Sequence, residues 1–493
     1  MATPGNAIEV DHLKRTLPDD DAHPYRSGAW RPQSTEWRVD EVEVVEGAIP
    51  DDLDGIYARN TENPLHESIT AYHPFDGDGM VHAICFGGGK ASYRNRFVRT
   101  AGLQAEQDAG ESLWAGLAES PKVAKRTDSL TARPAMKDAS STDLVVHNGE
   151  ILTSFWQCGE LYRLDPESLD TLGPTRWDGW FPSEGVSAHT KVDEATGELF
   201  FFNYGTEWPY LHFGCVDASG NLVHYTPIPL PGPRLPHDMA ITEHFVVLND
   251  LPMHWDEDLL LTGVHAVRMH DKPTRLAVVP RRGTEVDVQW FEADPTYVLH
   301  WTNAYEDGDE VVLEGFHEGT PSPRKAEIGD EMWMYRYLAL DWMETRLHRW
   351  RLNRRTGECT EEHLRDEFTE FGIINGRYTG REHRYVWAAQ GKPGWFLFDG
   401  FVRHDTETGA DDVLRLPEGT YGSEVGVAPR PRGTAEDDAY IVTFTTDVVN
   451  DRSECLILDG RRISDGPIAR LRLPERISSG THATWAPCTA LAR

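Results

Sequence analysis

The segment Asp193–Phe202, with the sequence DEATGELFFF, shows the pattern that decides the fold of this chain. A group of turn-forming residues that ends in glycine comes directly before a short apolar run with strong strand preference. The aspartate side chain can cap such a turn, and the glycine can adopt the positive φ that the turn requires. The segment is therefore predicted to form a hairpin turn followed by a buried strand.

The same alternation of turns and short apolar runs recurs along the chain. Similar turn segments are Asp165–Ser168, Asp217–Asn221, Arg354–Gly357 and Asp405–Gly409. Similar apolar runs are Phe245–Leu248, Val311–Leu313 and Tyr440–Phe444. Short strands joined by hairpin turns over hundreds of residues indicate an all-β fold, either a barrel, a sandwich or a propeller.

The spacing of these strands favours a propeller. Seven blades would take about 70 residues each, against roughly 40–50 for a bare four-stranded blade. The additional residues would form long loops on one face. The sequence shows no regular repeat, so we expect the blades to be irregular.

Two segments are predicted to be helical, near residues 103–117 and 330–347. The second is rich in methionine and aromatic residues, so it forms either a helix packed on the sheets or a wall of an apolar substrate tunnel. Charged residues mark 1–44 as a solvated leader, followed by a propeller over 45–493. No internal linker indicates a domain boundary, so residues 1–493 are predicted to form a single domain.

The overall composition excludes several classes of function. A formal net charge of -33 argues against nucleic acid as a partner and against electrostatic docking to anionic membranes. The six cysteines form no CxxC pair, which fits a reducing compartment and argues against a thiolate zinc site. No signal peptide and no apolar run long enough to span a membrane is evident. We therefore expect a soluble cytoplasmic protein.

Four histidines far apart in the chain stand in short phrases that resemble strand ends. They are His189 in SAHT, His237 in LPHD, His300 in LHWTNAYE and His482 in GTHATW. If they converge, they form a metal site of neutral imidazoles, which leaves the full charge of a dipositive ion available for oxygen chemistry. A site of two histidines and one carboxylate is the competing metal hypothesis. It is disfavoured because His237 and Asp238 are adjacent, and neighbours on a strand point to opposite faces.

Several longer motifs resemble the carotenoid cleavage oxygenases, a family that also includes stilbene-cleaving and phenylpropenoid-cleaving enzymes. They are Ile49–Asn60 (IPDDLDGIYARN), Phe75–His82 (FDGDGMVH) and Tyr93–Thr100 (YRNRFVRT). The resemblance continues through Asn303–Glu306, Glu370-Phe371 and Pro429–Pro431 to His482. It therefore extends from about residue 45 to the end of the chain.

The resemblance implies a seven-bladed β-propeller with a dome of loops and helices over an iron centre. One Fe²⁺ per chain would be held by the four histidines. Glu370 and Glu424 would each accept a hydrogen bond from a ligand imidazole, which fixes its tautomer and orientation. Gln157 stands where the family usually has a third glutamate; its amide oxygen can accept the same bond without charge. A shift of this match onto Glu160 remains open.

The resemblance also implies oxidative cleavage of a conjugated C=C bond by O₂ into two carbonyl products. The alkene supplies all four electrons, so no organic redox cofactor is needed, and no catalytic residue beyond the iron centre is expected. Stilbene-cleaving relatives hold a phenolic hydroxyl with a Tyr and a Lys, where this chain has Leu117 and Trp156. We therefore expect a carotenoid or apocarotenoid substrate, with Phe75, Leu117 and Trp156 lining its tunnel.

Other functions remain open at this point. The chain can be a stilbene-cleaving or phenylpropenoid-cleaving dioxygenase, a hydrolytic zinc propeller, or a propeller scaffold whose four histidines pack in the core. An apolar tunnel mouth could make transient contact with a membrane surface. The sequence does not give the oligomeric state or the cleaved bond.

Overall fold

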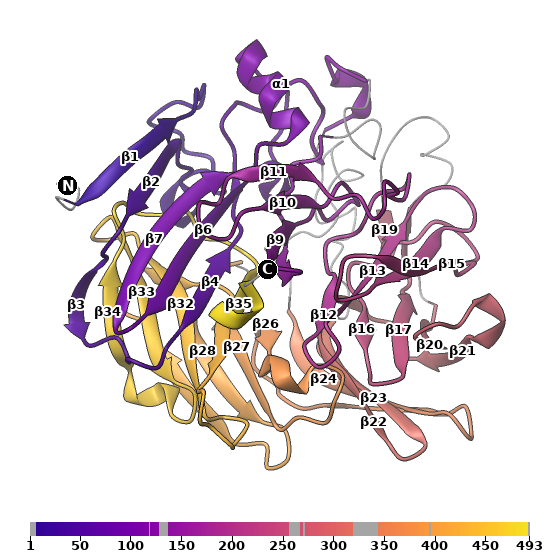
Figure 1. The fold of residues 1–493 in the computed structure, drawn as a ribbon. Helices are drawn as coiled ribbons and strands as arrows, with labels where there is room; N and C mark the ends of the chain where they lie inside the picture. The colour runs from indigo at the N-terminus through magenta and orange to yellow at the C-terminus, as the bar shows by residue number, and fades with distance from the viewer. Residues whose placement is uncertain are drawn as a thin grey trace.

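The computed structural model describes residues 6–117, 119–127, 137–255, 267–269, 272–318, 344–393 and 396–491. Nearly all regular structure in these residues is β. The sheets are arranged around a common centre as the blades of a propeller, as Figure 1 shows. The predicted all-β propeller is therefore confirmed.

Four of the blades are antiparallel sheets of four strands in chain order. Two of them consist of β8 (Leu144–His147), β9 (Glu150–Thr153), β10 (Tyr162–Leu164) and β11 (Thr171–Pro174), and of β12 (Lys191–Asp193), β13 (Glu198–Tyr204), β14 (Leu211–Val216) and β15 (Leu222–Pro227). The next two consist of β16 (Ala240–Ile241), β17 (Phe245–Asp250), β20 (Thr274–Pro280) and β21 (Gln289–Ala293), and of β22 (Tyr297–Asp307), β23 (Glu310–Glu318), β24 (Arg346–Asn353) and β25 (Cys359–His363). A separate two-stranded ribbon pairs β18 (Met253–Trp255) with β19 (Val267–Met269).

The segment Asp193–Phe202 forms the turn and strand that its sequence predicts. Asp193 ends β12, and its carboxylate accepts a hydrogen bond from the backbone nitrogen of Ala195 at 3.0 Å. Gly197 has a φ of +72°, which only glycine adopts without strain. The apolar run then enters β13, where Leu199–Phe202 is fully buried between the blades.

The last two blades are joined into one ten-stranded sheet. Its strands are β26 (Thr369–Ile373), β27 (Tyr385–Gly391), β28 (Phe398–Asp405), β29 (Asp411–Arg415), β30 (Thr420–Gly422), β31 (Gly426–Pro429), β32 (Ala439–Asp447), β33 (Arg452–Asp459), β34 (Pro467–Arg472) and β3 (Glu43–Gly47). The short strand β30 pairs with both β28 and β32, so it connects the sixth blade to the seventh.

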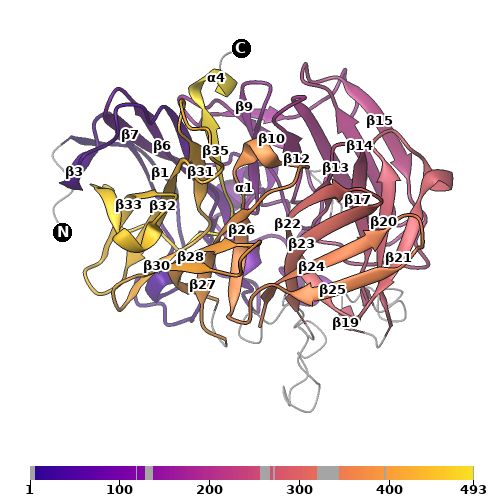
Figure 2. The same cartoon turned by 90° about the horizontal axis from the view of Figure 1, so that it is seen from below.

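The first blade closes the ring. It contains β1 (Ala7–His12), β2 (Thr35–Val39), β4 (Gly55–Arg59), β5 (Glu62–Asn63), β6 (Asp78–Gly87), β7 (Lys90–Phe97) and the C-terminal strand β35 (Ala483–Pro487). β35 pairs with β4, and β3 pairs with β34 of the last blade. The ring is therefore closed in two places, by a C-terminal strand that pairs in the first blade and by an N-terminal strand that pairs in the last blade. Figure 2 shows β6 and β7 of the first blade near β32 and β33 of the last blade.

The described residues 6–44 do not form the predicted solvated leader. β1 and β2 belong to the first sheet, where β2 pairs with β7. Trp30, between these strands, is only 5% exposed. The charged residues that suggested a leader lie largely on exposed edge positions, as in β1. A charged edge strand and a solvated tail have similar compositions, which explains the error.

The first predicted helix is shorter than expected. α1 spans Ala101–Ala109; the Thr100 hydroxyl accepts a hydrogen bond from the Leu103 nitrogen at 3.0 Å, and Gly110 with a φ of +74° ends the helix. Of the second predicted helix, residues 330–343 lie outside the described residues, and residues 346–347 begin β24. A short helix, α4 (Cys488–Leu491), follows β35.

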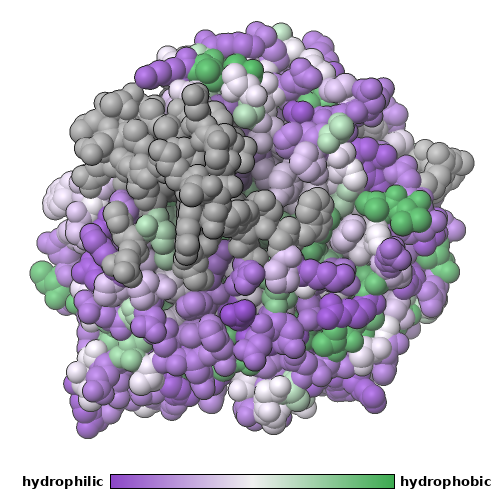
Figure 3. All heavy atoms as spheres, turned by 180° about the vertical axis from the view of Figure 1, so that it is seen from behind, coloured by the Kyte–Doolittle hydropathy of each residue, from purple (hydrophilic) through white to green (hydrophobic). Residues whose placement is uncertain are grey.

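The molecular surface in the view of Figure 3 is largely hydrophilic. Figure 3 shows hydrophilic residues over most of the described surface in that view, with apolar residues in small separate patches. No helix within the described part of the chain is long and apolar enough to cross a membrane.

Candidate metal centre

The innermost strands of the seven blades converge at the centre of the ring. β8 contacts β12 and β35, β22 contacts β16 and β26, and β31 contacts β35. Each of these seven strands places one polar side chain at or close to its beginning. The seven residues are Asp143, His189, His237, His300, Glu370, Glu424 and His482. Side chains that are far apart in the sequence therefore meet at the axis.

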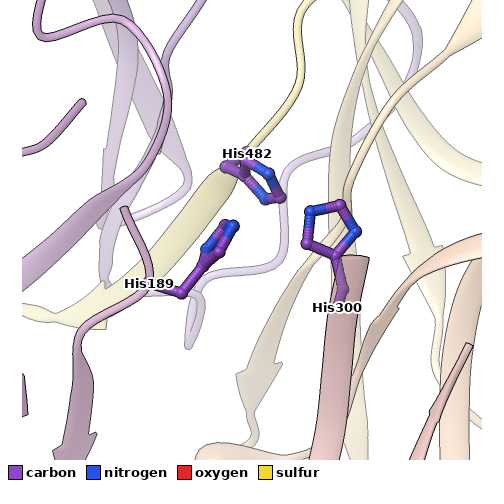
Figure 4. A group of neighbouring side chains, drawn as sticks. All are labelled: His189, His300 and His482. Atoms are coloured by element: carbon purple, nitrogen blue, oxygen red, sulfur yellow. The ribbon is translucent and has the colours of Figure 1, made fainter. Parts of the chain in front are cut away.

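The four predicted histidines are brought together at this point. Ligand nitrogens of His189, His300 and His482 all lie within 4.8 Å of one another, and Figure 4 shows their rings facing a common centre. Nε2 of His237 lies 3.1 Å from Nε2 of His189. All four side chains are buried. The convergence on which the metal hypothesis depends is thus present in the structure.

Three of the imidazoles have a carboxylate behind them. Nδ1 of His300 lies 2.6 Å from a carboxylate oxygen of Glu370. Nδ1 of His482 lies 3.4 Å from Glu424, at the long end of the hydrogen-bonding range. A carboxylate accepts the Nδ1 proton, so the Nε2 lone pair of such a ring is directed to the centre. Glu370 and Glu424 therefore occupy the positions that the sequence predicts for them.

The third carboxylate was missed by the sequence analysis. Nδ1 of His189 lies 2.8 Å from a carboxylate oxygen of Asp143. The signal that could have identified Asp143 is its position directly before an innermost strand, which it shares with His482. Nδ1 of His237 has no hydrogen-bond partner among the described residues. Gln157 is buried, and its role as a partner of a ligand imidazole stays a prediction.

Asp238, the residue after His237, is engaged by other groups, although neither residue lies in a strand as the sequence argument assumed. Asp238 forms an ion pair with Lys191 at 2.8 Å and accepts a hydrogen bond from the backbone nitrogen of Trp301 at 2.7 Å. It is therefore a structural neighbour of the site and does not line it, which removes the hypothesis of a carboxylate ligand at this position.

The donor set fits a divalent transition-metal ion. Nε2 of His300 is buried and has no partner among the described residues, so its lone pair faces the centre unsatisfied. Burial lowers the pKa of His189, His237 and His300 well below the usual value. These imidazoles are therefore neutral, as a metal requires. For His482, burial is outweighed by Glu424, which raises its pKa to about 9, so an ion bound there would displace a proton.

An aromatic wall borders the imidazoles. The ring of Phe371 stacks on that of His300, with 5.3 Å between centroids, and lies edge-on to His482. Phe396 and Phe398 pack against Phe371. Phe371 has a φ of +56°, a conformation that costs free energy for a residue with a side chain. Only the adjacent Glu370 was singled out from the sequence, because nothing in the pattern reveals such a backbone conformation.

The three residues predicted to line the substrate tunnel lie together. The rings of Phe75 and Trp156 are 6.0 Å apart between centroids. Trp156 and Leu117 are buried in the same apolar cluster, against which Phe75 packs. The backbone nitrogen of Trp156 donates to the hydroxyl of Thr142, the residue before Asp143. The three side chains therefore belong to one apolar cluster, and their contact with substrate stays a prediction.

A small cavity lies close to this group, because Asp76 and Phe155 in its lining are the sequence neighbours of Phe75 and Trp156. Its volume is about 50 Å³, and its lining includes Tyr72, Asp76, Lys137 and Phe155. None of the four histidines lines it.

The fold and the centre together define a β-propeller with a buried, histidine-lined candidate metal centre. Residues 30–487 match the model of the family described as retinal pigment epithelial membrane protein. The chain belongs to this family, that of the carotenoid cleavage oxygenases, and is an oxygenase. The resemblance drawn from the sequence motifs is thereby confirmed.

Relatives with two kinds of substrate match nearly the whole chain. The carotenoid 9,10(9',10')-cleavage dioxygenase 1 of Pisum sativum is 30% identical over 94% of this chain and 89% of its own length. The lignostilbene-alpha,beta-dioxygenase isozyme III of Sphingomonas paucimobilis is 29% identical over 94% of this chain and 97% of its own length. The crystal structure of Pseudomonas brassicacearum lignostilbene dioxygenase superposes with a TM-score of 0.84 and 27% identity, covering 96% of this chain and 100% of that chain.

Proposed function

We propose that this protein is a non-haem Fe²⁺ dioxygenase that cleaves a conjugated C=C bond with O₂ into two carbonyl products. His189, His237, His300 and His482 would hold one iron ion per chain. The unsatisfied, buried Nε2 of His300, inside a cluster of four converging imidazoles, is the observation that carries this proposal.

The side chains around the centre suit this reaction. Bound iron would supply the redox chemistry by which O₂ reacts with a closed-shell alkene. Asp143, Glu370 and Glu424 hold three imidazoles in the tautomer that presents Nε2 to the ion. The aromatic side chains beside the imidazoles exclude water from the reacting bond.

The overall reaction needs no further reactant. One alkene and one O₂ give two carbonyl groups, with the alkene supplying all four electrons. A proton donor or acceptor is therefore not required.

We infer that the substrate is a carotenoid or apocarotenoid. Phe75, Leu117 and Trp156 offer an apolar surface. Leu117 and Trp156 offer no phenol or ammonium group at the positions where the stilbene-cleaving members are expected to bind a phenolic hydroxyl. A site without such groups has no means to recognise that hydroxyl.

A stilbene or phenylpropenoid substrate is the second candidate. It is favoured by the close structural likeness to a lignostilbene dioxygenase over 96% of this chain and 100% of that chain. The distinction matters because a stilbene is much shorter than a carotenoid and would occupy a shorter part of a substrate tunnel.

One aerobic assay distinguishes the candidates. Iron-loaded protein would be incubated with an apocarotenal, a 4-hydroxystilbene and a 4-hydroxyphenylpropenoid, and the carbonyl products identified by mass spectrometry. Fastest cleavage of the apocarotenal supports the first candidate, and fastest cleavage of a phenolic substrate supports the second. Iron analysis after anaerobic reconstitution provides the control, because a propeller scaffold would retain no iron. A hydrolytic zinc enzyme would act without O₂.

A further inference from the structure

The strand that carries Glu370 is irregular at the residue that follows it. Glu370 of β26 pairs with Ala389 of β27. Three residues further along β26, Ile373 pairs with Trp387, which is only two residues from Ala389. The extra residue forms a β-bulge in which Phe371 has a φ of +56°. A bulge with a residue in this left-handed conformation usually has glycine there, and strain at a bulky residue is retained where it serves a function.

The bulge brings two consecutive side chains to the same imidazole. Neighbours in a regular strand point to opposite faces. Here, a carboxylate oxygen of Glu370 lies 2.6 Å from Nδ1 of His300. The ring of Phe371 stacks on the ring of His300, with 5.3 Å between centroids and 27° between the planes. The hydrogen bond fixes the direction of one ring atom of His300, and the stacked ring also fixes the plane of the imidazole.

The backbone of Phe371 holds the same carboxylate. Its N–H donates a hydrogen bond at 2.7 Å to the oxygen of Glu370 that also faces Nδ1 of His300. The extra residue of a bulge is released from the ladder of strand hydrogen bonds, which leaves its N–H available for this contact. Glu370 and Phe371 are both buried, so water does not compete for the carboxylate.

Phe371 also contacts a second imidazole of the centre. Its ring lies edge-on to that of His482, with 5.1 Å between centroids and 78° between the planes. The rings of Phe396 and Phe398 pack edge-on against Phe371, at 5.9 and 5.4 Å between centroids. These contacts hold the Phe371 ring in place against His300 and His482.

Glycine at position 372 lets the bulge pack against the neighbouring blade. A Cβ atom at Gly372 would lie 2.7 Å from the ring of Phe316 and 2.7 Å from the hydroxyl oxygen of Thr302. Thr302 belongs to β22 and Phe316 to β23, in the blade that carries His300. The bulge is therefore seated directly on this blade, with no space for an added methyl group.

We propose that Phe371 is a positioning residue of the candidate metal centre. Its ring sets the planes of the His300 and His482 imidazoles, and its backbone N–H holds the carboxylate that orients His300. This role rests on the proposed function, because His300 and His482 would be ligands of the proposed iron ion. It extends that function by assigning the geometry of two ligands to a residue that has no metal-binding atom.

The experiment uses the full-length protein loaded with Co²⁺, whose visible absorption depends on the arrangement of its ligands. Phe371→Leu keeps most of the apolar volume and loses the planar ring. We expect a changed cobalt spectrum and a Co²⁺ affinity about tenfold lower, as for other groups that orient metal ligands, measured by competition with a chelator. Phe371→Tyr keeps the ring and should retain the spectrum and the affinity of the unchanged protein.

Phe368→Leu is the matched control. Phe368 is buried in the same apolar cluster as Phe371, and its ring stacks on Phe398 at 5.9 Å. Among the described residues, its ring contacts none of the four imidazoles. This variant should lower the unfolding temperature of the metal-free protein, as Phe371→Leu does, but leave the cobalt spectrum and the affinity unchanged.

The possible results distinguish this role from the proposed function. If the unchanged protein binds neither Co²⁺ nor Fe²⁺, both are overturned. Metal binding with the same spectrum and affinity in Phe371→Leu, or an equal change in Phe368→Leu, overturns the role of Phe371 and leaves the metal centre in place.

Discussion

Asp238 accepts a hydrogen bond from the backbone nitrogen of Trp301 at 2.7 Å, and this bond ties the segment that carries His237 to the strand β22 that carries His300. Asp238 follows His237, and Trp301 follows His300. The pairing of β22 with β23 is irregular at Trp301, so its N–H needs a partner outside the ladder. The ion pair of Asp238 with Lys191 extends the connection to the strand that follows His189.

Replacing Asp238 by Asn should therefore weaken metal binding without removing a ligand. Asn keeps the size of the side chain but loses the charge that pairs with Lys191 and one of the two acceptor oxygens. We expect iron affinity to fall about 10- to 100-fold, as for other residues that orient metal ligands. Competition with a chelator measures this. Asp465→Asn, at an exposed position, is the control. Unchanged affinity in Asp238→Asn would show that the connection does not position the histidines.

Glu370 provides a test of the carboxylates behind the imidazoles. Its side chain is buried, and burial raises its pKa to about 8 although His482 opposes this shift. Glu370→Gln can still accept the His300 Nδ1 proton, whereas Glu370→Ala cannot. We expect iron affinity to decrease in the order Glu, Gln, Ala, with the full loss on the order of 10- to 100-fold. Equal affinities of the Gln and Ala variants would mean that the hydrogen bond itself contributes nothing.

The residues that could be predicted from the sequence are those whose local pattern carries the information. The turn at Gly197 follows from its own short segment, and the four histidines stand in short segments whose joint match to the family motifs identifies them. Asp143 could not be predicted, because its contact with His189 arises only when β8 lies next to β12 in the fold. The N-terminal strands were not predicted, because a charged edge strand has the same composition as a solvated segment. The conformation of Phe371 depends on packing across blades, which no local pattern contains.

Removal of the metal should lower the stability of the whole propeller. The ligands come from four blades, so an ion that binds only the folded chain raises the unfolding free energy by mass action. At a free iron concentration 100 times the dissociation constant the gain is about 2.7 kcal/mol. Anaerobic thermal unfolding with and without a chelator measures the difference. A variant lacking His237 should unfold at the same temperature in both conditions, and a continued effect of the chelator there would place the ion elsewhere.

A buried ionic network in β23 predicts how stability depends on pH. Glu314 is fully buried, 2.6 Å from Arg349 and 3.1 Å from Nε2 of His383. Burial opposes its ionisation, but His383 and Arg349 outweigh burial and lower its pKa. Its contribution is therefore fully present above the unfolded pKa of about 4.3 and is lost as pH falls through the lower folded value.

Glu314→Gln should accordingly cost about 3–5 kcal/mol at pH 7, because Arg349 is left buried without its partner. The difference from the unchanged protein should stay constant from pH 7 to pH 5 and shrink at lower pH, measured by urea unfolding. Glu310→Gln in the same strand breaks a more exposed ion pair with Arg351 and should cost less than about 1 kcal/mol. A gap between Glu314→Gln and the unchanged protein that widens on acidification would contradict this account.

Trp156→Lys tests the choice between the two substrate classes. Trp156 is 1% exposed and packs against Phe75, at the position where the stilbene-cleaving relatives are expected to carry a lysine. A lysine there would offer an ammonium group to a phenolic hydroxyl and remove the apolar surface that a polyene needs. We expect kcat/KM for the apocarotenal to fall by at least tenfold and the relative rate for the 4-hydroxystilbene to rise. Trp156→Met keeps the apolar character and should leave the preference between the substrates unchanged. An unaltered preference in Trp156→Lys, with iron content intact, would show that this position does not contact the substrate.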